Sequence, residues 1–305
     1  MAIPELRHLR YLLAVTQYGT FTRAAEHLHI SQPTLSQQLR QLERIVGVRL
    51  LDRGGRTVRP TDAGEVYVAH ARRALRELAA AERAVGDVQD LSRGQLRLGV
   101  TPTFTAYLVG PLMAALHARH PGLGLTVTEA MQDRIEDALL ADALDAGIGF
   151  AGGPVQSGIA VEPLFTERLG LLTTVGGNDK GLPVDRLPEW ELALLSGDFA
   201  TRSWIDAYFV EHGVAPRVAV EADSALALLE MVRGGTLGTL LPDVVAQGRP
   251  ELASVQLMPP PPARTAALLT REGGYSSAAC RAFVDLLRQY VEERGWHTAA
   301  VARSS

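Results

Sequence analysis

Residues 30–43 of this 305-residue chain read Ile30-Ser31-Gln32-Pro33-Thr34-Leu35-Ser36-Gln37-Gln38-Leu39-Arg40-Gln41-Leu42-Glu43. Ser31 can cap the free N–H groups of a helix, and Pro33 is tolerated in a first helical turn, where its missing N–H costs little. Leucines recur at positions 35, 39 and 42, which is the spacing of a helix with one buried face. We therefore predict a helix that begins at Ser31-Gln32-Pro33 and ends near Gly47.

The other face of this predicted helix carries side chains that can read base pairs. Gln32, Thr34, Ser36 and Gln37 crowd its first turns, and the N-terminal end of a recognition helix is the part that meets base edges in the major groove. Glutamine pairs bidentately with adenine, and serine and threonine bond to several bases. Arg40 is long enough to reach a phosphate. The alternative is a polar face that is merely solvated.

The neighbouring segments complete a winged helix-turn-helix. Apolar spacing predicts helices over residues 5–17 and 22–28, the second capped by Thr20 or Thr22. Residues 48–60 form two short extended pieces around Gly54-Gly55, which predicts a β-hairpin, the wing. Besides the polar residues of the third helix, the candidates for DNA contact are Ser31 and Pro33 at its start and Thr22, Arg23, Arg53 and Arg56.

The charge distribution supports a polyanion-binding N-terminus. The first 60 residues hold nine arginines against four acids, a net charge of +5, and the other residues carry −9, so the whole-chain value of −4 hides the contrast. A basic N-terminal segment in an otherwise acidic chain favours the interpretation that the polar helix face binds DNA over the interpretation that it is merely solvated.

Residues 61–92 are predicted to form a long linker helix. The apolar positions Val68, Ala71, Leu75, Leu78 and Val85 follow a narrow 3-4-3 pattern, which is more typical of a two-helix coiled coil than of packing on a globular core. We predict a homodimer through this helix. A single helix lying on its own body is the alternative.

The rest of the chain alternates strand and helix patterns, which predicts parallel sheets covered by helices. Strands are expected at 95–100, 123–129, 146–150, 169–175, 192–195, 218–221 and 237–241. Helices are expected at 108–119, 134–141, 204–212, 225–233 and 277–294. Two α/β units of about 100 residues fit this stretch. The fold class is therefore α/β overall, with an N-terminal winged helix-turn-helix.

Several segments together resemble the LysR-type transcriptional regulators. They are Phe21-Thr22-Arg23-Ala24-Ala25, residues 30–43, Leu51-Asp52-Arg53, Thr61-Asp62-Ala63-Gly64, His120-Pro121 and Ala143-Leu144-Asp145-Ala146-Gly147-Ile148. Within that family the chain is most similar to regulators of cyanate degradation. The matching residues are Arg93-Gly94-Gln95-Leu96-Arg97, Thr101-Pro102-Thr103-Phe104-Thr105, Gly110-Pro111-Leu112-Met113-Ala114, Phe199-Ala200-Thr201-Arg202 and Thr239-Leu240-Leu241-Pro242.

The resemblance implies a DNA-binding domain at 1–60, a linker helix at 61–92 and an effector-binding domain at 93–302. The last consists of two Rossmann-like lobes of periplasmic-binding-protein type, lobe I at 93–166 and 269–302 and lobe II at 167–268. It also implies double-stranded operator DNA, a small effector between the lobes, a dimer or tetramer, and RNA polymerase as a further partner of an activator.

The effector candidates lie where predicted strands lead into helices. Hydroxyls and free N–H groups at helix starts suit an anion, which fits cyanate. The candidates are Thr101, Thr103, Phe104, Gln132, Phe199, Thr201 and Arg202. For each threonine alone, capping a helix is the competing role, and Arg202 can equally be exposed. Regulators of aromatic or other carboxylate catabolism remain the alternative.

The sequence lacks the motifs of several other function classes. No dinucleotide, phosphate-loop or nucleophile-elbow motif and no clustered metal ligands are present, so we expect neither an enzyme nor a cofactor nor a metal. The only cysteine, Cys280, has no partner for redox sensing and fits a reducing cytoplasm. No apolar run reaches about 18 residues, so no membrane span is expected.

Overall fold

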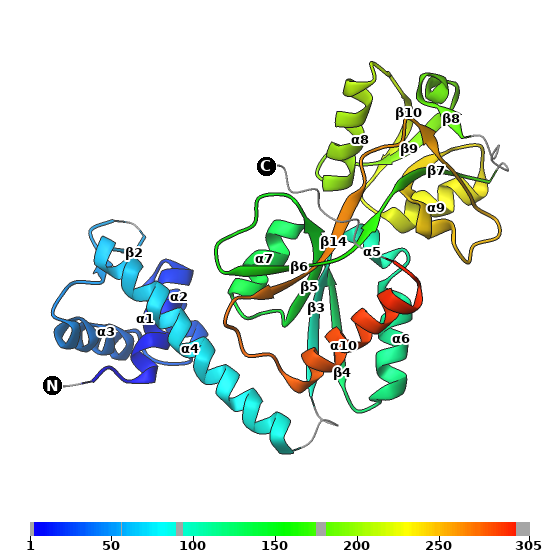
Figure 1. Ribbon diagram of the computed structural model, residues 1–305. Coiled ribbons are helices and arrows are strands. Elements are labelled where there is room, and N and C mark those ends of the chain that lie inside the picture. The colour runs from blue at the N-terminus through cyan, green and yellow to red at the C-terminus, as the bar shows by residue number, and fades with distance from the viewer. Residues whose placement is uncertain (1–2, 56, 90–93, 175–180, 297–305) are drawn as a thin grey trace, which may run out of the picture. The chain divides into compact units, whose positions relative to one another are not determined.

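A computed structural model describes residues 3–55, 57–89, 94–174 and 181–296 (Figure 1). Arg56, one of the predicted DNA contacts, lies outside these ranges. The chain divides into two compact units, Met1–Val85 and Gly86–Ser305, with the boundary inside a long helix. We call the first unit the head and describe each unit by itself. No helix in the described ranges combines the length and the apolar character needed to cross a membrane.

The head consists of three helices, a hairpin and the start of the long helix. The elements are α1 (Leu6–Tyr18), α2 (Phe21–His27), α3 (Gln32–Val46), β1 (Leu51–Asp52), β2 (Arg59–Pro60) and α4 (Asp62–Gln89). Strands β1 and β2 pair antiparallel, as predicted for the wing. The core is apolar and includes Leu12, Leu35, Leu39, Leu42, Leu50 and Val68.

The helix ends of the head follow from single residues. The Thr20 hydroxyl accepts a hydrogen bond from the Arg23 backbone N–H at 3.3 Å, which selects Thr20 over Thr22 as the cap of α2. Ser31 caps α3 in the same way, accepting from the Thr34 backbone N–H at 3.3 Å. Gly47 ends α3 with a φ of 82°, in the left-handed region that glycine adopts without steric cost.

The second unit contains a five-stranded sheet, which with its helices we call lobe I (Figure 1). Its strand order is β4 (Gly124–Glu129), β3 (Gln95–Val100), β5 (Ala146–Ala151), β14 (Arg264–Arg271) and β6 (Ile159–Glu167). Its helices are α5 (Pro102–Thr105), α6 (Val109–Arg119), α7 (Gln132–Leu140) and α10 (Ala278–Glu293).

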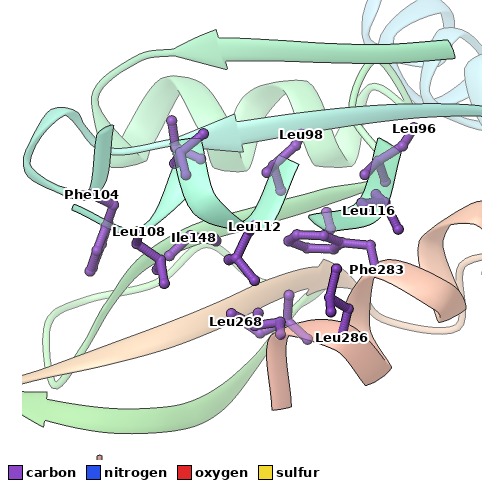
Figure 2. Packing of buried hydrophobic residues seen from close by; sticks show 14 of the residues in the cluster. Leu96, Leu98, Phe104, Leu108, Leu112, Leu116, Ile148, Leu268, Phe283 and Leu286 are labelled. Carbon is purple, nitrogen blue, oxygen red and sulfur yellow. The ribbon is translucent and has the colours of Figure 1, made fainter. Parts of the chain in front are cut away.

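Lobe I buries apolar residues on both faces of its sheet. Figure 2 shows Leu112 and Leu116 of α6 near Phe283 of α10, beside the strand residues Leu96 and Leu98. A separate cluster joins Ile135 and Leu139 of α7 to Ala267 and Leu269 of β14. Leu268 belongs to the first cluster, so successive β14 residues point to opposite faces, as a pleated strand requires.

Lobe II is built on three smaller sheets between Leu169 and Met258. They comprise β11 (Thr239–Pro242), β7 (Leu169–Thr173) and β12 (Ala253–Val255); β9 (Glu191–Leu195) and β10 (Arg217–Ala222); and β8 (Leu182–Pro183) and β13 (Leu257–Met258). Helices α8 (Ala200–Glu211) and α9 (Ala225–Gly234) and the 3-10 helices η2 (Val184–Glu189) and η3 (Asp243–Ala246) complete it. Side chains of α8 and α9 lie in two separate apolar cores.

The prediction of parallel sheets is confirmed for some strand pairs and wrong for others. Strand β3 is parallel to β4 and β5, and β9 is parallel to β10, but β14 is antiparallel to β5 and β6, and β7 is antiparallel to β11 and β12. Strands β6 and β14 are additions to the predicted set. They adjoin the two places where the chain passes between the lobes, so they run in opposite directions (Figure 1). Their pairing includes a register shift opposite Pro163, where a missing N–H is tolerated.

Candidate functional site

The recognition helix α3 presents the polar face that its sequence predicts. Gln32, Thr34, Gln37 and Arg40 are exposed and Ser36 is half-buried, whereas the leucines of the opposite face are buried. The Ser31 and Thr34 hydroxyls also lie 2.7 Å apart, so both side chains take part in the cap. The cap thus uses the hydroxyls of Ser31 and Thr34, whereas no described hydrogen bond of the cap involves the side chains of Gln32, Ser36 or Gln37.

The wing is tied to α3 through Glu43. One Glu43 carboxylate oxygen accepts hydrogen bonds from the backbone N–H groups of Leu50 and Leu51 at 3.0 and 3.1 Å. The other accepts from the Arg53 guanidinium at 2.9 Å, and that guanidinium lies 5.1 Å from the centre of the Phe21 ring. The sequence predicts Arg53 as a phosphate contact, but the structure gives its charge a partner inside the head. The Arg53 side chain thereby joins the wing to α3.

Two arginines outside the predicted set lie beside the recognition face. Arg44 and Arg49 line a shallow groove of about 490 Å³ together with Gln37 and Arg40. In the part of the chain that the structure describes, Arg40, Arg44 and Arg49 form no ion pair, and all three are exposed. Thr22 and Arg23, at the start of α2, are exposed as well. Unpaired guanidinium groups are suited to phosphates.

The second unit contains a cavity of about 560 Å³ to which both lobes contribute. Its lining comes from the start of α7, the end of β5 and the loop after it, α8, and the first residue of β14. These residues are Gln132, Asp133, Glu136, Phe150, Ala151, Gly152, Gly153, Pro154, Val155, Gln156, Ala200, Trp204 and Arg264. The size lies within the range of about 300–1,000 Å³ that is usual for small-molecule sites.

Gln132, the predicted effector residue from α7, organises one wall of this cavity. Its amide oxygen accepts from the Phe150 backbone N–H at 2.8 Å, and its amide nitrogen donates to the Phe150 carbonyl at 3.1 Å. The same nitrogen donates to Glu136 at 3.0 Å, and Glu136 also accepts from the Gln156 backbone N–H at 3.0 Å. Gln132 thus fixes the end of β5 and the loop after it.

A buried polar network lies at the junction of the lobes. The Arg264 guanidinium donates to the Thr201 hydroxyl at 2.6 Å and forms an ion pair with Glu167, and both ionic side chains are at most 2% exposed. The Tyr107 hydroxyl donates to the other Glu167 oxygen at 2.6 Å. Burial, and then the nearby Glu167 charge, raise the pKa of Tyr107 well above its ordinary value, so the phenol stays a donor. The guanidinium lies 4.3 Å from the centre of the Phe150 ring.

The predicted threonines are buried, and Thr101, Thr103 and Thr201 are not among the residues that line the cavity. Thr101 and Thr103 are 6% and 2% exposed, and their hydroxyls have no hydrogen-bond partner in the described structure. Thr101 precedes α5 without capping it. Helix α5 has only four residues, so its dipole is short and the predicted anion attraction of its N-terminus is weak.

Three residues that were predicted to bind the effector do not line the cavity. Phe104 and Phe199 are 0% and 4% exposed and belong to apolar cores. Arg202 lies within α8, which begins at Ala200, before the predicted start at Trp204. It donates to Asp206 at 2.8 Å and to Glu221 at 2.6 Å, and it is not among the cavity residues. Its charge is therefore compensated away from the lining.

The cation at the cavity is Arg264, which sequence reasoning missed together with Glu167, Phe150 and Trp204. The available signal was an arginine opening the apolar run Arg264-Thr265-Ala266-Ala267-Leu268-Leu269. No group of three or more histidine, cysteine or acidic side chains among the described residues is arranged to hold a metal ion.

Comparisons with known proteins match both units. Residues 6–65 match the family described as bacterial regulatory helix-turn-helix protein, lysR family, and residues 89–292 match the LysR substrate binding domain. The nitrogen assimilation regulatory protein nac of Klebsiella aerogenes is 32% identical over 80% of this chain and 80% of its own. The DNA-binding transcriptional dual regulator OxyR of Escherichia coli (strain K12) is 32% identical over 88% of this chain and 90% of its own.

Solved structures match along almost the whole chain. A single-residue variant of full-length OxyR from Pseudomonas aeruginosa has a TM-score of 0.66 and 26% identity, covering 94% of this chain and 96% of its own. Full-length CbnR in complex with its target DNA has a TM-score of 0.53 and 26% identity, covering 93% of this chain and 99% of its own.

Proposed function

This chain belongs to the LysR family of DNA-binding transcriptional regulators, and we propose that it reads operator DNA through its head and responds to a small molecule held between its two lobes. Its relatives are regulators, not enzymes. The observation that carries the proposal is the polar face of α3, on which Gln32, Ser36 and Gln37 lie. Gln37 lines a groove with Arg40, Arg44 and Arg49, which form no ion pair among the described residues.

The proposed division of labour follows from chemistry. Gln32, Ser36 and Gln37 read bases, because amide and hydroxyl groups match base edges. Arg23, Arg40, Arg44 and Arg49, with Thr22 and Arg56, hold phosphates and set the position of the head on DNA. Ser31, Pro33, Thr34 and Arg53 shape the elements that present these groups. We propose a cytoplasmic location, because operator DNA is the proposed partner of the head.

Substitutions in the head test the assignment of base-reading and phosphate-binding residues. We expect Gln32→Ala or Ser36→Ala to weaken binding to an operator selected from random sequences by about 1–3 kcal/mol, with little change on scrambled DNA. Arg44→Ala and Arg49→Ala are expected to weaken both equally and to lower the salt slope of log K by about 0.9 each. Gel-shift titrations at several salt concentrations measure both quantities.

Arg217→Ala is the matched control, because Arg217 is an exposed arginine of the second unit that pairs with Glu191. Unchanged operator affinity in the Gln32 and Ser36 variants would remove the base-reading assignment.

The effector is proposed to be a small anion. Supporting this is the guanidinium of Arg264, which lines the cavity. Cyanate is the effector that the narrower resemblance implies. A three-atom anion fills only a small part of about 560 Å³, so an organic carboxylate is the second candidate, favoured by the cavity size and by Phe150 and Trp204.

Thermal unfolding of the full chain distinguishes these candidates. Cyanate, azide and benzoate are titrated at constant ionic strength, and a ligand that binds the folded state raises the melting temperature. A rise with cyanate and azide alone supports the cyanate response, whereas a rise with benzoate alone supports the organic carboxylate. No rise with any of the three contradicts an anionic effector of either kind.

Dimerisation through α4, a tetramer of two dimers and contact with RNA polymerase are part of the same proposal. An effector shifts such an assembly only to the extent that it binds one arrangement better than another.

A further inference from the structure

Arg264 is the one basic side chain among the described residues that line the cavity, and it is only 2% exposed. A guanidinium carries five N–H donors. Thr201 and Glu167 each accept from one terminal nitrogen, and the Nε of Arg264 is buried without any hydrogen-bond partner among the residues that the structure describes. The cation at the cavity is therefore incompletely satisfied.

Glu167 has a second donor that does not depend on Arg264. The Tyr107 hydroxyl donates to it at 2.6 Å, and Tyr107 comes from the segment between α5 and α6 of lobe I. If the guanidinium turned to another anion, Glu167 would keep this hydrogen bond. This hydrogen bond lowers the free-energy cost of separating Glu167 from Arg264, because a buried carboxylate is most destabilising when it has no donor at all.

The ion pair also lies where the lobes are joined. Arg264 and Glu167 face each other in the antiparallel ladder of β14 and β6. Strand β6 ends at Glu167, and β7 of lobe II begins two residues later at Leu169. Thr201, the other partner of Arg264, is the second residue of α8 in lobe II. One guanidinium thus contacts both lobes and the cavity.

We propose that Arg264 recognises the negatively charged group of the effector and that Glu167 is the internal anion with which the effector competes. This inference rests on the proposed function, and it names the residue that selects the ligand class, a compound with one carboxylate or similar anionic group. Binding exchanges the Glu167–Arg264 ion pair for an effector–Arg264 ion pair. Occupancy of the cavity therefore changes the contacts of Glu167 at the junction of β6 and β7.

The acidic side chains of α7 leave Arg264 as the group that attracts an anionic ligand to the described lining of the cavity. Asp133 and Glu136 line the same cavity, and Glu136 is held by the neutral donors of Gln132 and Gln156. Neither offers an anion any stabilisation. A ligand with a single anionic group and an otherwise uncharged body therefore fits better than a dianion.

The test compares an anion with its neutral isostere, so that only charge recognition is measured. Benzoate and benzamide, and acetate and acetamide, are titrated into the full chain, with binding followed by tryptophan fluorescence because Trp204 lines the cavity. The readout is the affinity ratio of acid over amide. A residue with only a structural role would change both affinities together and leave this ratio unchanged.

Glu167→Gln removes the competing charge while it keeps the shape and the acceptor for Tyr107. We expect the acid-over-amide ratio to rise by about 5- to 150-fold, the usual range for coupled interactions. Arg264→Met alone leaves Glu167 buried without its counter-charge and is expected to fold poorly. The double variant Arg264→Met/Glu167→Gln removes both charges and should bind acid and amide equally.

Arg202→Met is the matched control, since Arg202 is an arginine of α8 whose charge is paired outside the cavity. It is expected to keep the wild-type ratio. The proposal is overturned if the double variant still prefers the acid, or if Glu167→Gln binds neither benzoate nor acetate better than its amide. Operator binding of the same samples is measured in parallel, so a failure of the regulator assignment is seen separately.

Discussion

Cys280 is the single cysteine of the chain, and it lies in the core of lobe I. Its side chain is 3% exposed, and its sulfur lies 3.7 Å from the backbone oxygen of Asp145. Burial raises the pKa of the thiol above its ordinary value and outweighs the opposing effect of a hydrogen bond with Ser276. The thiol is therefore protonated at neutral pH, although relatives of this chain include proteins named hydrogen peroxide-inducible genes activators.

We predict that Cys280 is chemically inert in the folded protein, because thiolate is the reactive form. Ellman's reagent should label it many times more slowly at pH 8 than in denaturant, and hydrogen peroxide should leave operator binding unchanged. Above the unfolded pKa of about 8.5, the unfolded state loses a proton that the folded state keeps, so stability should fall as pH rises. Cys280→Ala should remove that slope. Native-state labelling at the denatured rate would contradict the prediction.

At the scale of an element, the start of α4 is set against the wing by a glycine. A Cβ at Gly64 would lie 1.9 Å from the Leu50 backbone oxygen. The Gly64 N–H donates to the Thr61 hydroxyl at 3.0 Å, and that hydroxyl donates to the Arg49 carbonyl at 2.8 Å. The turn between wing and helix is thus held by hydrogen bonds of the Thr61 hydroxyl, and the Leu50 backbone leaves no room for a side chain at position 64.

Gly64→Ala is predicted to destabilise the head by about 1–3 kcal/mol or more, since the clashing atom belongs to the backbone. Urea denaturation monitored by circular dichroism measures this. Gly234→Ala is the matched control in α9, because a Cβ there meets no described atom within 4 Å and no proline follows. It should be neutral or stabilise by up to about 1 kcal/mol, the helix propensity gain of alanine over glycine. Equal effects of the two substitutions would contradict the close-packing explanation.

At the scale of the whole molecule, α4 divides the predicted apolar seam into two parts. Val68 and Ala71 are 4% and 3% exposed, and Val68 belongs to the head core. Leu78 and Val85 are 42% and 62% exposed, seven residues apart on the same face of the helix. Only the second part of the seam is available to a second copy of the chain.

We predict that Leu78→Asp/Val85→Asp dissociates the proposed homodimer without unfolding the chain, because both side chains are exposed. Analytical ultracentrifugation of the full chain measures the change in mass. Val66→Asp is the control, since Val66 is a 63% exposed valine that lies off this seam on the same helix. Dissociation by the control, or none by the double variant, would assign the interface to other residues.

The local chemistry of the sequence determined the head and most element positions. Ser31 and Gly47 bound the recognition helix through their own backbone and hydroxyl geometry, and the leucine spacing fixed its buried face. The amide and hydroxyl face and the +5 charge of the first 60 residues were likewise readable, because base reading depends on side chains that are close in the chain.

Only the tertiary structure decided the site between the lobes. Glu167 and Arg264 are 97 residues apart and meet because β6 and β14 pair antiparallel, and Arg202 is removed from the cavity because Asp206 and Glu221 lie beside it. Periodicity reports which face of an element is buried, but it carries no information about which distant charge will stand opposite. A buried cation is stable only where such a partner has been brought to it.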